Sequence, residues 1–462
     1  MVFAGVPFLF YFLPVLLAAY FIVPMRMRAG RNLVLLVGSL IFYAWGEGSY
    51  VLLLLLSIFM NHLIAHRLGR TALARRWLIG GVAANLLLLG WFKYAGFFGR
   101  SIGLGEIADP HLPLGISFFT FQAISYLVDV ARQEAKPARR LIDSALYIAS
   151  FPQLIAGPIV RFQTIATALT ERRETIALFA EGVRIFLLGL GQKVLFANLA
   201  AGPADAIFAL PADGLSPVLA WIGMVAYSLQ IFFDFAGYSN MAIGLGLMVG
   251  FRFPANFATP YCAQSVTEFW RRWHMTLSRW FRDYLYIPLG GNRHGEGRTI
   301  ANLWIVFLLC GLWHGAAWTF VLWGAWHGLF LSVERLARQH TRWTLPRPLR
   351  HLYLLVAVMF GWVLFRADTL SHAGDLYTAL LGRQGTDALP LAAYLPGMTG
   401  LWLGVAALFA TPLPQLIMTG LMNRAPLAVS APSTIIGFSL LFVACAAFVA
   451  GGAYNPFIYF RF

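Results

Sequence analysis

The stretch Ile300-ANLWIVFLLCGLWHGAAWTFVLWGAWHGLFLS-Val333 runs for 34 residues without an Asp, Glu, Lys or Arg. A helix that crosses a membrane needs about 20 mostly apolar residues, so this run is long enough for one strongly tilted helix or two short ones. A water-soluble fold would have to cover the whole segment with polar surface, whereas lipid accepts it directly. The run therefore predicts a membrane fold.

The rest of the chain has the same character. Of the 462 residues, 59% are hydrophobic and 11% are charged, whereas an average soluble protein has about 25% charged residues. Apolar runs recur along the whole length and form about 10 to 12 helical segments, some too short to cross a bilayer alone. Alternating strands of about ten residues, which would predict a membrane β-barrel, are absent. The sequence predicts an all-α, multi-pass membrane protein with a single domain over residues 1–462.

The charge of the chain is strongly basic, at +15 from 34 basic and 19 acidic residues. On a soluble protein this excess would suggest nucleic acid. Here the basic residues gather in short loops between apolar runs, as at Arg26, Arg28 and Arg31. Such loops stay in the cytoplasm and fix the orientation of the spans. We therefore expect membrane lipid, and no nucleic acid, as the partner of these charges.

One segment is amphipathic, Glu268-FWRRWHMTLSRWFR-Asp283. A single helix over it would place the aromatic residues and His274 on one side and four arginines on the other. These arginines are Arg271, Arg272, Arg279 and Arg282. The pattern predicts a helix at the cytoplasmic membrane surface. Its arginine face suits either an anchor on anionic lipid headgroups or a dock for a phosphate-rich acyl donor.

The uncharged run contains a near repeat, GLWHG at 311–315 and GAWHG at 324–328. Glycines four residues apart let helices approach closely, which explains the glycines but not the two histidines. Ionisable side chains inside a membrane are costly and usually functional. Because burial favours the neutral imidazole, such a ring can accept a proton from a hydroxyl as a general base. His314 is the first catalytic candidate and His327 a secondary one.

A carboxylate stands within another apolar run, IFFDFAG at 231–237. Asp234 either caps a broken helix, pairs with an arginine, orients a catalytic histidine or lines a cavity. The sequences GYSN at 237–240 and FPAN at 253–256 predict helix breaks, which are tolerated at membrane depth where they line a cavity. The chain has no Gly-x-Ser-x-Gly motif, no phosphate loop of the Walker type and no metal-ligand spacing. Any chemistry must rest on histidine and an already activated cofactor, with no metal.

These motifs resemble those of a known family. The run FWRRWHMTLSRWFRDYLYIPLGGNR at 269–293 is similar to the signature of the membrane-bound O-acyltransferases, and more narrowly to their bacterial alginate O-acetylation branch. FPQLIAGPIVR at 151–161, FDFAGYS at 233–239, GLWHGA at 311–316 and the tail PFIYF at 456–460 support the resemblance. One departure is Asn240, where this branch usually has Asp.

The resemblance implies a ring of about 10 to 12 tilted and re-entrant helices around a central funnel. It also implies an enzyme of the bacterial inner membrane that moves acetyl from cytoplasmic acetyl-CoA for O-acetylation of an envelope or secreted polysaccharide, alginate first. In the family, the histidine of the Trp-His-Gly motif is catalytic, which maps onto His314. A second histidine in the arginine-rich motif maps onto His274, and the four arginines would hold the phosphates of acetyl-CoA. A periplasmic acetyltransferase partner is implied in the same way.

Two alternatives remain from the sequence. A transporter or flippase of lipid-linked sugars would also use broken helices and an intramembrane carboxylate. It does not explain the paired Trp-His-Gly motifs. Within the family, a D-alanyl transferase would take its acyl group from a carrier protein. Such a donor needs a flat docking surface more than an arginine cluster.

Overall fold

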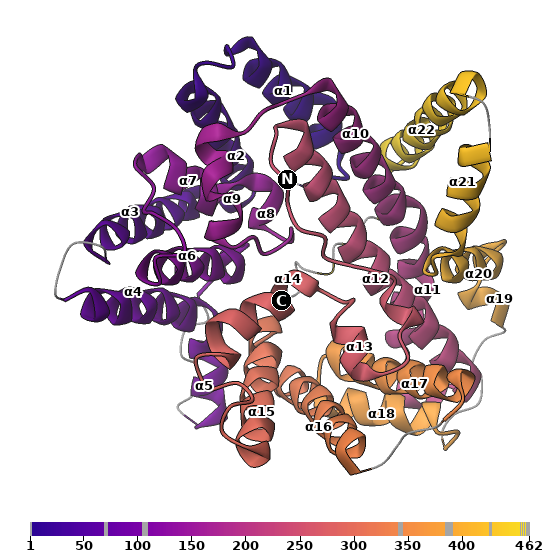
Figure 1. Cartoon of the computed structure of the whole chain (residues 1–462). Coiled ribbons are helices and arrows are strands. Elements are labelled where there is room, and N and C mark those ends of the chain that lie inside the picture. Colours follow the sequence, from indigo (N-terminus) through magenta and orange to yellow (C-terminus); the bar gives the residue numbers. More distant parts are fainter. Residues whose placement is uncertain are drawn as a thin grey trace. The chain divides into compact units, whose positions relative to one another are not determined.

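A computed structural model describes residues 2–68, 73–103, 110–340, 345–383, 391–424 and 427–452, together with residues 454, 456 and 458. Over these residues the secondary structure is helical and includes no strand (Figure 1). This confirms the all-α prediction. Much of the aromatic tail, including Phe457 and Tyr459, lies outside the described residues.

Six helical stretches in the described part of the chain are long and apolar enough to cross a membrane, and a bent pair, 399–409 with 413–421, would make a seventh. The protein is therefore a multi-pass membrane protein, as predicted. Other predicted segments form helices that are shorter or more polar. The six stretches are Arg28–Leu68, Ala74–Ser101, Ile176–Phe208, Pro217–Met248, Arg347–Arg366 and Ala431–Ala450.

The chain divides into two compact units. Unit 1 comprises Met1–Phe186 and Tyr238–Ala255, and unit 2 comprises Leu187–Gly237 and Asn256–Phe462. The helices α10 and α12 contribute residues to both units, because two of the boundaries between the units fall inside them. The single domain over residues 1–462 and the ring of helices around a funnel stay predictions.

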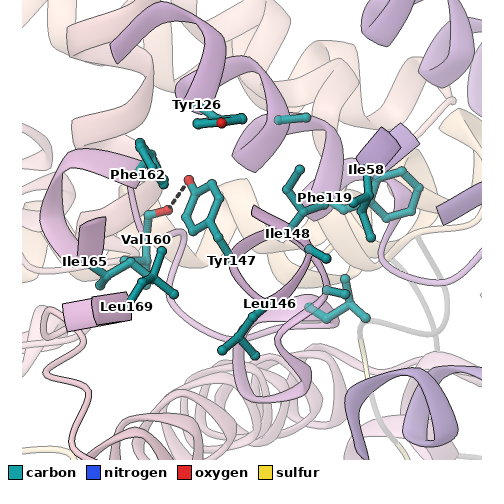
Figure 2. Close-up of a cluster of buried hydrophobic side chains, with 14 of the residues drawn as sticks. Ile58, Phe119, Tyr126, Leu146, Tyr147, Ile148, Val160, Phe162, Ile165 and Leu169 are labelled. Atoms are coloured by element: carbon teal, nitrogen blue, oxygen red, sulfur yellow. Dashed lines mark hydrogen bonds between the residues drawn. The ribbon is translucent and has the colours of Figure 1, made fainter. Parts of the chain in front are cut away.

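Unit 1 is built mainly from the N-terminal helices, coloured indigo to purple in Figure 1. Its buried core includes Tyr126, Tyr147 and Phe162, whose rings lie 4.5 to 6.4 Å apart. Figure 2 shows the Tyr147 hydroxyl donating to the Val160 carbonyl oxygen, at 2.9 Å. The elements are η1 (Pro7–Phe12), α1 (Leu13–Ile22), α2 (Arg28–Glu47), η2 (Gly48–Tyr50), α3 (Val51–Leu68), α4 (Ala74–Leu89), η3 (Gly90–Tyr94), α5 (Ala95–Ser101), α6 (Ile116–Ala131), α7 (Leu141–Ala149), α8 (Phe151–Leu154), α9 (Phe162–Glu171), the first part of α10 (Ile176–Gly191) and the part of α12 (Pro217–Met248) from residue 238.

A polar cluster joins the first basic loop of unit 1 to the segment before α10. The Glu174 carboxylate accepts hydrogen bonds from Arg28 and from the Tyr20 hydroxyl, and it lies 3.2 Å from a guanidinium nitrogen of Arg31. Burial alone would raise the pKa of the Glu174 carboxyl, but the hydrogen bonds from Arg28 and Tyr20 outweigh burial and lower the pKa to about 2. The carboxylate is therefore charged at neutral pH and holds three separate segments together.

Unit 2 contains every candidate site residue. It begins with the end of α10. Its other elements are η4 (Gln192–Ala197), α11 (Asn198–Phe208), η5 (Ala212–Gly214), α12 (Pro217–Met248, to residue 237), η6 (Pro260–Cys262), α13 (Val266–Trp270), α14 (Met275–Phe281), η7 (Arg282–Tyr286), α15 (Glu296–His314), α16 (Trp318–His340), α17 (Arg347–Arg366), α18 (Leu370–Leu380), α19 (Leu391–Tyr394), α20 (Thr399–Phe409), α21 (Leu413–Arg424) and α22 (Leu427–Ala450).

The uncharged run of the sequence forms two helices, α15 and α16, which pack as a hairpin. Glycine is required where they touch. A methyl group added to Gly311 would lie 2.2 Å from the Phe320 carbonyl oxygen, and one added to Gly324 would lie 2.2 Å from the Phe307 carbonyl oxygen. These contacts confirm the close approach expected from the glycines. Gly328 is different, since its added methyl would make only ordinary contacts at 3.6 Å or more.

The helix break predicted at residues 237–240 is wrong. Helix α12 continues without interruption from Pro217 to Met248. Gly237 serves packing instead, because a methyl group there would lie 2.7 Å from the Gly189 carbonyl oxygen. The second predicted break, at 253–256, is real, since the chain leaves helical structure after Met248 until η6.

Candidate active site

The arginine-rich segment does not form the single amphipathic helix that the sequence predicted. It consists of α13 and α14 with a break between them, where His274 adopts a left-handed backbone with φ 41° and ψ 51°. A non-glycine residue in this conformation is uncommon, and the surrounding structure must hold it there. The two faces nevertheless exist. Trp270, Trp273 and Leu277 are buried, whereas Arg271 is exposed.

Asn256 holds the backbone on the C-terminal side of this break. Its carbonyl oxygen accepts from the Met275 N–H at 2.9 Å. Its side-chain Oδ1 accepts from the Thr276 N–H at 3.2 Å and from the Thr276 hydroxyl at 2.8 Å. The first turn of a helix has N–H groups without helical partners, and Asn256 satisfies two of them in α14. It thereby fixes the direction in which His274 leaves the backbone.

The imidazole of His274 is fully buried, with 0% of its surface exposed. Its ring packs edge-on against Phe235 with centroids 4.5 Å apart, and neither ring nitrogen has a hydrogen-bond partner among the described residues. Burial lowers the pKa of His274 to about 3, so the ring is neutral at pH 7. A neutral imidazole offers one donor and one acceptor. Leaving both unpaired in a buried place is costly, which marks them as available to a bound molecule.

His314 is the last residue of α15 and lies beside His274, with 6.3 Å between the ring centroids. Only 4% of its surface is exposed. Aromatic rings pack around it, with centroid distances of 4.9 Å to Trp313, 5.0 Å to Trp323 and 5.3 Å to Phe365. The structure thus brings the two predicted catalytic histidines together in a largely apolar enclosure.

His327 lies in a different environment, although its sequence motif is almost the same. Its Nδ1 accepts a hydrogen bond from the Trp270 indole N–H at 3.2 Å. The ring of Trp323 lies 5.0 Å from His327 and 5.0 Å from His314, so both histidines contact the same indole. The hydrogen bond joins α16 to α13. This arrangement favours a structural role for His327, which fixes Trp270 and the segment that carries His274.

Asp234 forms an ion pair with Lys193, and no histidine is its partner among the described residues. The Lys193 Nζ atom lies 2.8 Å from Oδ1 of Asp234, and both side chains are almost completely buried. The second carboxylate oxygen accepts the backbone N–H of Ile458 at 2.8 Å, while Lys193 donates to the Pro456 carbonyl oxygen. The pair therefore ties the C-terminal tail to α12 and η4. The sequence left a pairing with arginine open, and the partner is a lysine.

The four arginines of the motif differ in their partners. Arg272 pairs with Glu268 at 2.6 Å, and Arg282 pairs with Asp283 at 2.7 Å. Arg271 and Arg279 are exposed. An exposed guanidinium remains free to bind phosphate, and a surface ion pair contributes only about 0–1 kcal/mol, so the paired arginines also stay available to an anionic ligand.

The segment that carries these arginines is attached to the α15–α16 hairpin at both of its ends. At its start, the Glu334 carboxylate on α16 accepts from the backbone N–H groups of Val266 and Thr267, at 2.6 and 2.9 Å. At its end, the Asn302 side chain near the start of α15 donates to the Gly291 carbonyl oxygen at 3.0 Å. Both attachments lie at the end of the α15–α16 hairpin that is far from His314. The segment therefore enters and leaves at one end of the hairpin and reaches His314 through His274.

A cavity of about 210 Å³ lies at the other end of the hairpin, and it is lined among others by Asp205, Gln230, Thr319, Phe365, Arg366 and Asp368. Arg366 pairs with Asp205 at 2.9 Å in its wall. Thr319 and Glu334 are fifteen residues apart on α16, which corresponds to about 22 Å along the helix axis. The cavity and the attachment of the arginine-rich segment thus lie at opposite ends of α16.

The comparison with known proteins agrees with these features. The profile of MBOAT, the membrane-bound O-acyltransferase family, matches residues 114–371, which is more than half of the chain and includes both His274 and His314. The chain belongs to the membrane-bound O-acyltransferase family. As a member of it, the protein is an acyltransferase that works in lipid and takes an acyl group from a donor. The transporter interpretation is not supported.

Relatives within the family are similar over most or all of their length. The chain is 41% identical to a probable alginate O-acetylase of Azotobacter vinelandii, with both proteins covered completely. It is 45% identical to a probable alginate O-acetylase of Pseudomonas aeruginosa, over 82% of this chain and 75% of that protein. It is 39% identical to a peptidoglycan O-acetyltransferase of Helicobacter pylori, over 83% of this chain and 80% of that protein.

Several residues of this acyltransferase site were missed by sequence reasoning. Asn256 lies two residues after Pro254 at a correctly predicted helix break, but nothing in the sequence indicates that its amide caps a helix that begins nineteen residues later. The cavity draws residues from α11, α12, α16 and α17. Asp205 and Arg366, which stand 161 positions apart, could be paired only in the folded chain.

Proposed function

We propose that this membrane-bound O-acyltransferase is an O-acetyltransferase that takes acetyl from cytoplasmic acetyl-CoA and passes it to a hydroxyl acceptor on the opposite side of the bacterial inner membrane. The acetyl group serves O-acetylation of an envelope or secreted polysaccharide, with alginate first because the relatives that cover this chain completely carry that name. One observation carries the proposal. His274, which belongs to the arginine-rich segment, and His314 are buried side by side, and a cavity lies at the Thr319 end of α16.

His314 acts as the general base. A hydroxyl is a weak nucleophile until a neighbouring base accepts its proton. His314 is only 4% exposed, and the rings of Trp313, Trp323 and Phe365 surround it. The same enclosure limits water, which would otherwise hydrolyse the thioester.

His274 places the reacting group. Its unpaired donor can bind the carbonyl oxygen of the thioester, on which negative charge develops as the hydroxyl attacks. The left-handed backbone at His274 and the two side-chain hydrogen bonds to Asn256 hold the ring in place before the donor arrives. A hydrogen-bond donor that is already oriented stabilises the developing charge more effectively, because no free energy is spent on orienting it during the reaction.

The arginines of the motif bind the phosphates of acetyl-CoA. Arg271 and Arg279 are exposed, and a guanidinium matches the geometry of phosphate oxygens with two parallel hydrogen bonds. Anionic lipid headgroups offer the same chemistry. Arg271→Glu with Arg279→Glu should raise the KM for acetyl-CoA, whereas Arg26→Glu, an exposed arginine outside the motif, should not. An unchanged KM in the double variant would favour anchoring on lipid.

The acceptor side requires a partner in this proposal. A periplasmic acetyltransferase would receive the acyl group at the cavity end of the hairpin and carry it to the polymer. Support comes from the cavity itself, which reaches the exposed residue Asp368 at the end of α17. Offering the protein either acetyl-CoA or a D-alanyl carrier protein tests the alternative donor, since only one of these two thioesters should be consumed.

The direct test uses a bacterium that lacks its own copy of this gene. Wild-type protein should restore polymer-bound acetate. His314→Ala at equal membrane abundance should not restore it, and His111→Ala, which changes an exposed histidine in unit 1, should restore it fully. Normal acetylation by the His314 variant would overturn the assignment of the base.

A further inference from the structure

Phe365 touches His314 on one side and the cavity on the other. The ring centroids of Phe365 and His314 are 5.3 Å apart, and Phe365 belongs to the cavity wall. Phe320 packs beside it in the same wall, at 5.1 Å. His314 is not among the described residues that line the cavity. The cavity therefore ends one aromatic ring short of the base.

The cavity is suited to water and to polar ligands. Its volume of about 210 Å³ is far above the roughly 10–15 Å³ that one water molecule needs. Its lining runs from Asp368, which is exposed, to Gln230, which is only 3% exposed. The Gln230 side-chain oxygen has no hydrogen-bond partner among the described residues. A hydroxyl-bearing ligand can donate to this oxygen.

The Phe365 ring itself is held by apolar contacts. Trp323 lies at 5.1 Å and Trp362 at 5.5 Å from it. Moving the ring away from His314 breaks these contacts and costs free energy. A ligand can offset such a cost only by binding the open arrangement more tightly than the closed one. An acceptor that fills the cavity and pairs with Gln230 has that binding energy, whereas a single small water molecule gains little from the open arrangement.

From these contacts we propose that Phe365 is the gate that decides whether His314 activates an acceptor hydroxyl or water. This inference rests on the proposed function. In transfer, the hydroxyl gives its proton to His314, its oxygen bonds to the acyl carbon, the carbon–sulfur bond breaks, and the thiolate takes up the proton. The products are an ester and a free thiol. With water in place of the hydroxyl, the same sequence gives acetate and a free thiol, and the closed Phe365 ring suppresses this loss.

The experiment measures thiol release from acetyl-CoA by the purified full-length protein in lipid nanodiscs, with no acceptor other than water. Phe365→Ala should raise this hydrolysis rate by about tenfold or more, which is a barrier lowered by about 1.4 kcal/mol or more. Phe360→Ala is the matched control. It removes the same ring from the same helix, and neither the cavity nor His314 is among its described contacts. Adding His314→Ala to Phe365→Ala should abolish the increase.

The outcomes separate the gate from the proposed function. If the wild type releases thiol in a His314-dependent way and folded Phe365→Ala hydrolyses no faster, the gate is refuted while the enzyme assignment stands. If His314→Ala leaves thiol release unchanged, the proposed function fails first. Should Phe365→Ala not fold, Phe365→Leu decides, because it should still raise hydrolysis, by less than the alanine variant, and an unchanged rate would refute the gate.

Discussion

Removing the charge of Asp234 should destabilise the protein because the Lys193 ammonium would be left buried without a negative charge beside it. The pair has a 2.8 Å separation, and the side chains are 4% and 2% exposed. Breaking a buried ion pair from one side costs about 3–5 kcal/mol. Asp234→Asn keeps an oxygen that can accept from the Ile458 N–H, so this variant measures the effect of losing the charge alone. Lys193→Met makes the opposite single change and should cost a similar amount.

The double variant tests whether these costs come from one interaction. If they were independent, Asp234→Asn with Lys193→Met would lose about 6–10 kcal/mol. We expect it to lose no more than either single variant, because no unpaired charge remains buried. The coupling energy of the cycle should then be about 3 kcal/mol or more. The assay is the free energy of unfolding in detergent, measured by titration with sodium dodecyl sulfate.

Additive losses would contradict the buried pair as the reason for Asp234. The same variants also test its role in chemistry. Thiol release from acetyl-CoA by the folded double variant should stay dependent on His314. If Asp234→Asn abolished thiol release without loss of stability, the carboxylate would act in the reaction rather than anchor the tail.

Three further predictions follow from single contacts. His327→Asn should retain thiol release within about tenfold, because the amide oxygen can replace Nδ1 as the acceptor for Trp270; a complete loss in a folded variant would reveal a direct role. Gly311→Ala should lower the free energy of unfolding by about 1–3 kcal/mol through overpacking and Gly328→Ala by much less, so equal losses would disprove the close approach. The pKa of the Glu174 carboxyl is lowered from 4.5 to about 2. Its stabilising effect is therefore complete above pH 4.5 and is lost as the pH falls toward 2. The thermal midpoint of Glu174→Gln should be lower than that of the wild type at neutral pH and should fall less on acidification.

The membrane fold was predictable because it follows from composition and the length of apolar runs. The run at 300–333 forms α15 and α16, one of the two arrangements its length allowed. The apolar run at 231–251 was misread for a physical reason. Glycine and asparagine weaken a helix in isolation, but Gly237 packs on the Gly189 backbone, and this contact keeps α12 continuous.

The break at His274 could not be read from the sequence. Its flanking residues fit one amphipathic helix, and the burial of Trp270, Trp273 and Leu277 shows that the pattern of faces is real. The left-handed turn is imposed from outside by Asn256, which lies beyond any local signal. The periodicity of apolar residues indicates which face of a segment is buried. It does not reveal a turn that tertiary hydrogen bonds hold, because such a turn leaves the same residues buried.

The two Trp-His-Gly motifs show the same limit within the site. Their sequences are nearly identical, and only their neighbours distinguish them. His314 lies beside His274, whereas His327 accepts a hydrogen bond from Trp270. From the sequence His314 ranked first, and the resemblance to the family supported that ranking. The structure supplies a physical reason for treating His327 as structural.

The most direct test of the central claim is acetyl transfer by purified protein in lipid nanodiscs, comparing wild type with His314→Gln. The measured quantity is thiol released from acetyl-CoA per protein molecule, with the unfolding midpoint of both proteins determined in parallel. Loss of a general base costs about 10²–10⁴ in rate, so the glutamine variant should be at least about a hundredfold slower at an unchanged midpoint. A glutamine variant as fast as the wild type would contradict the account.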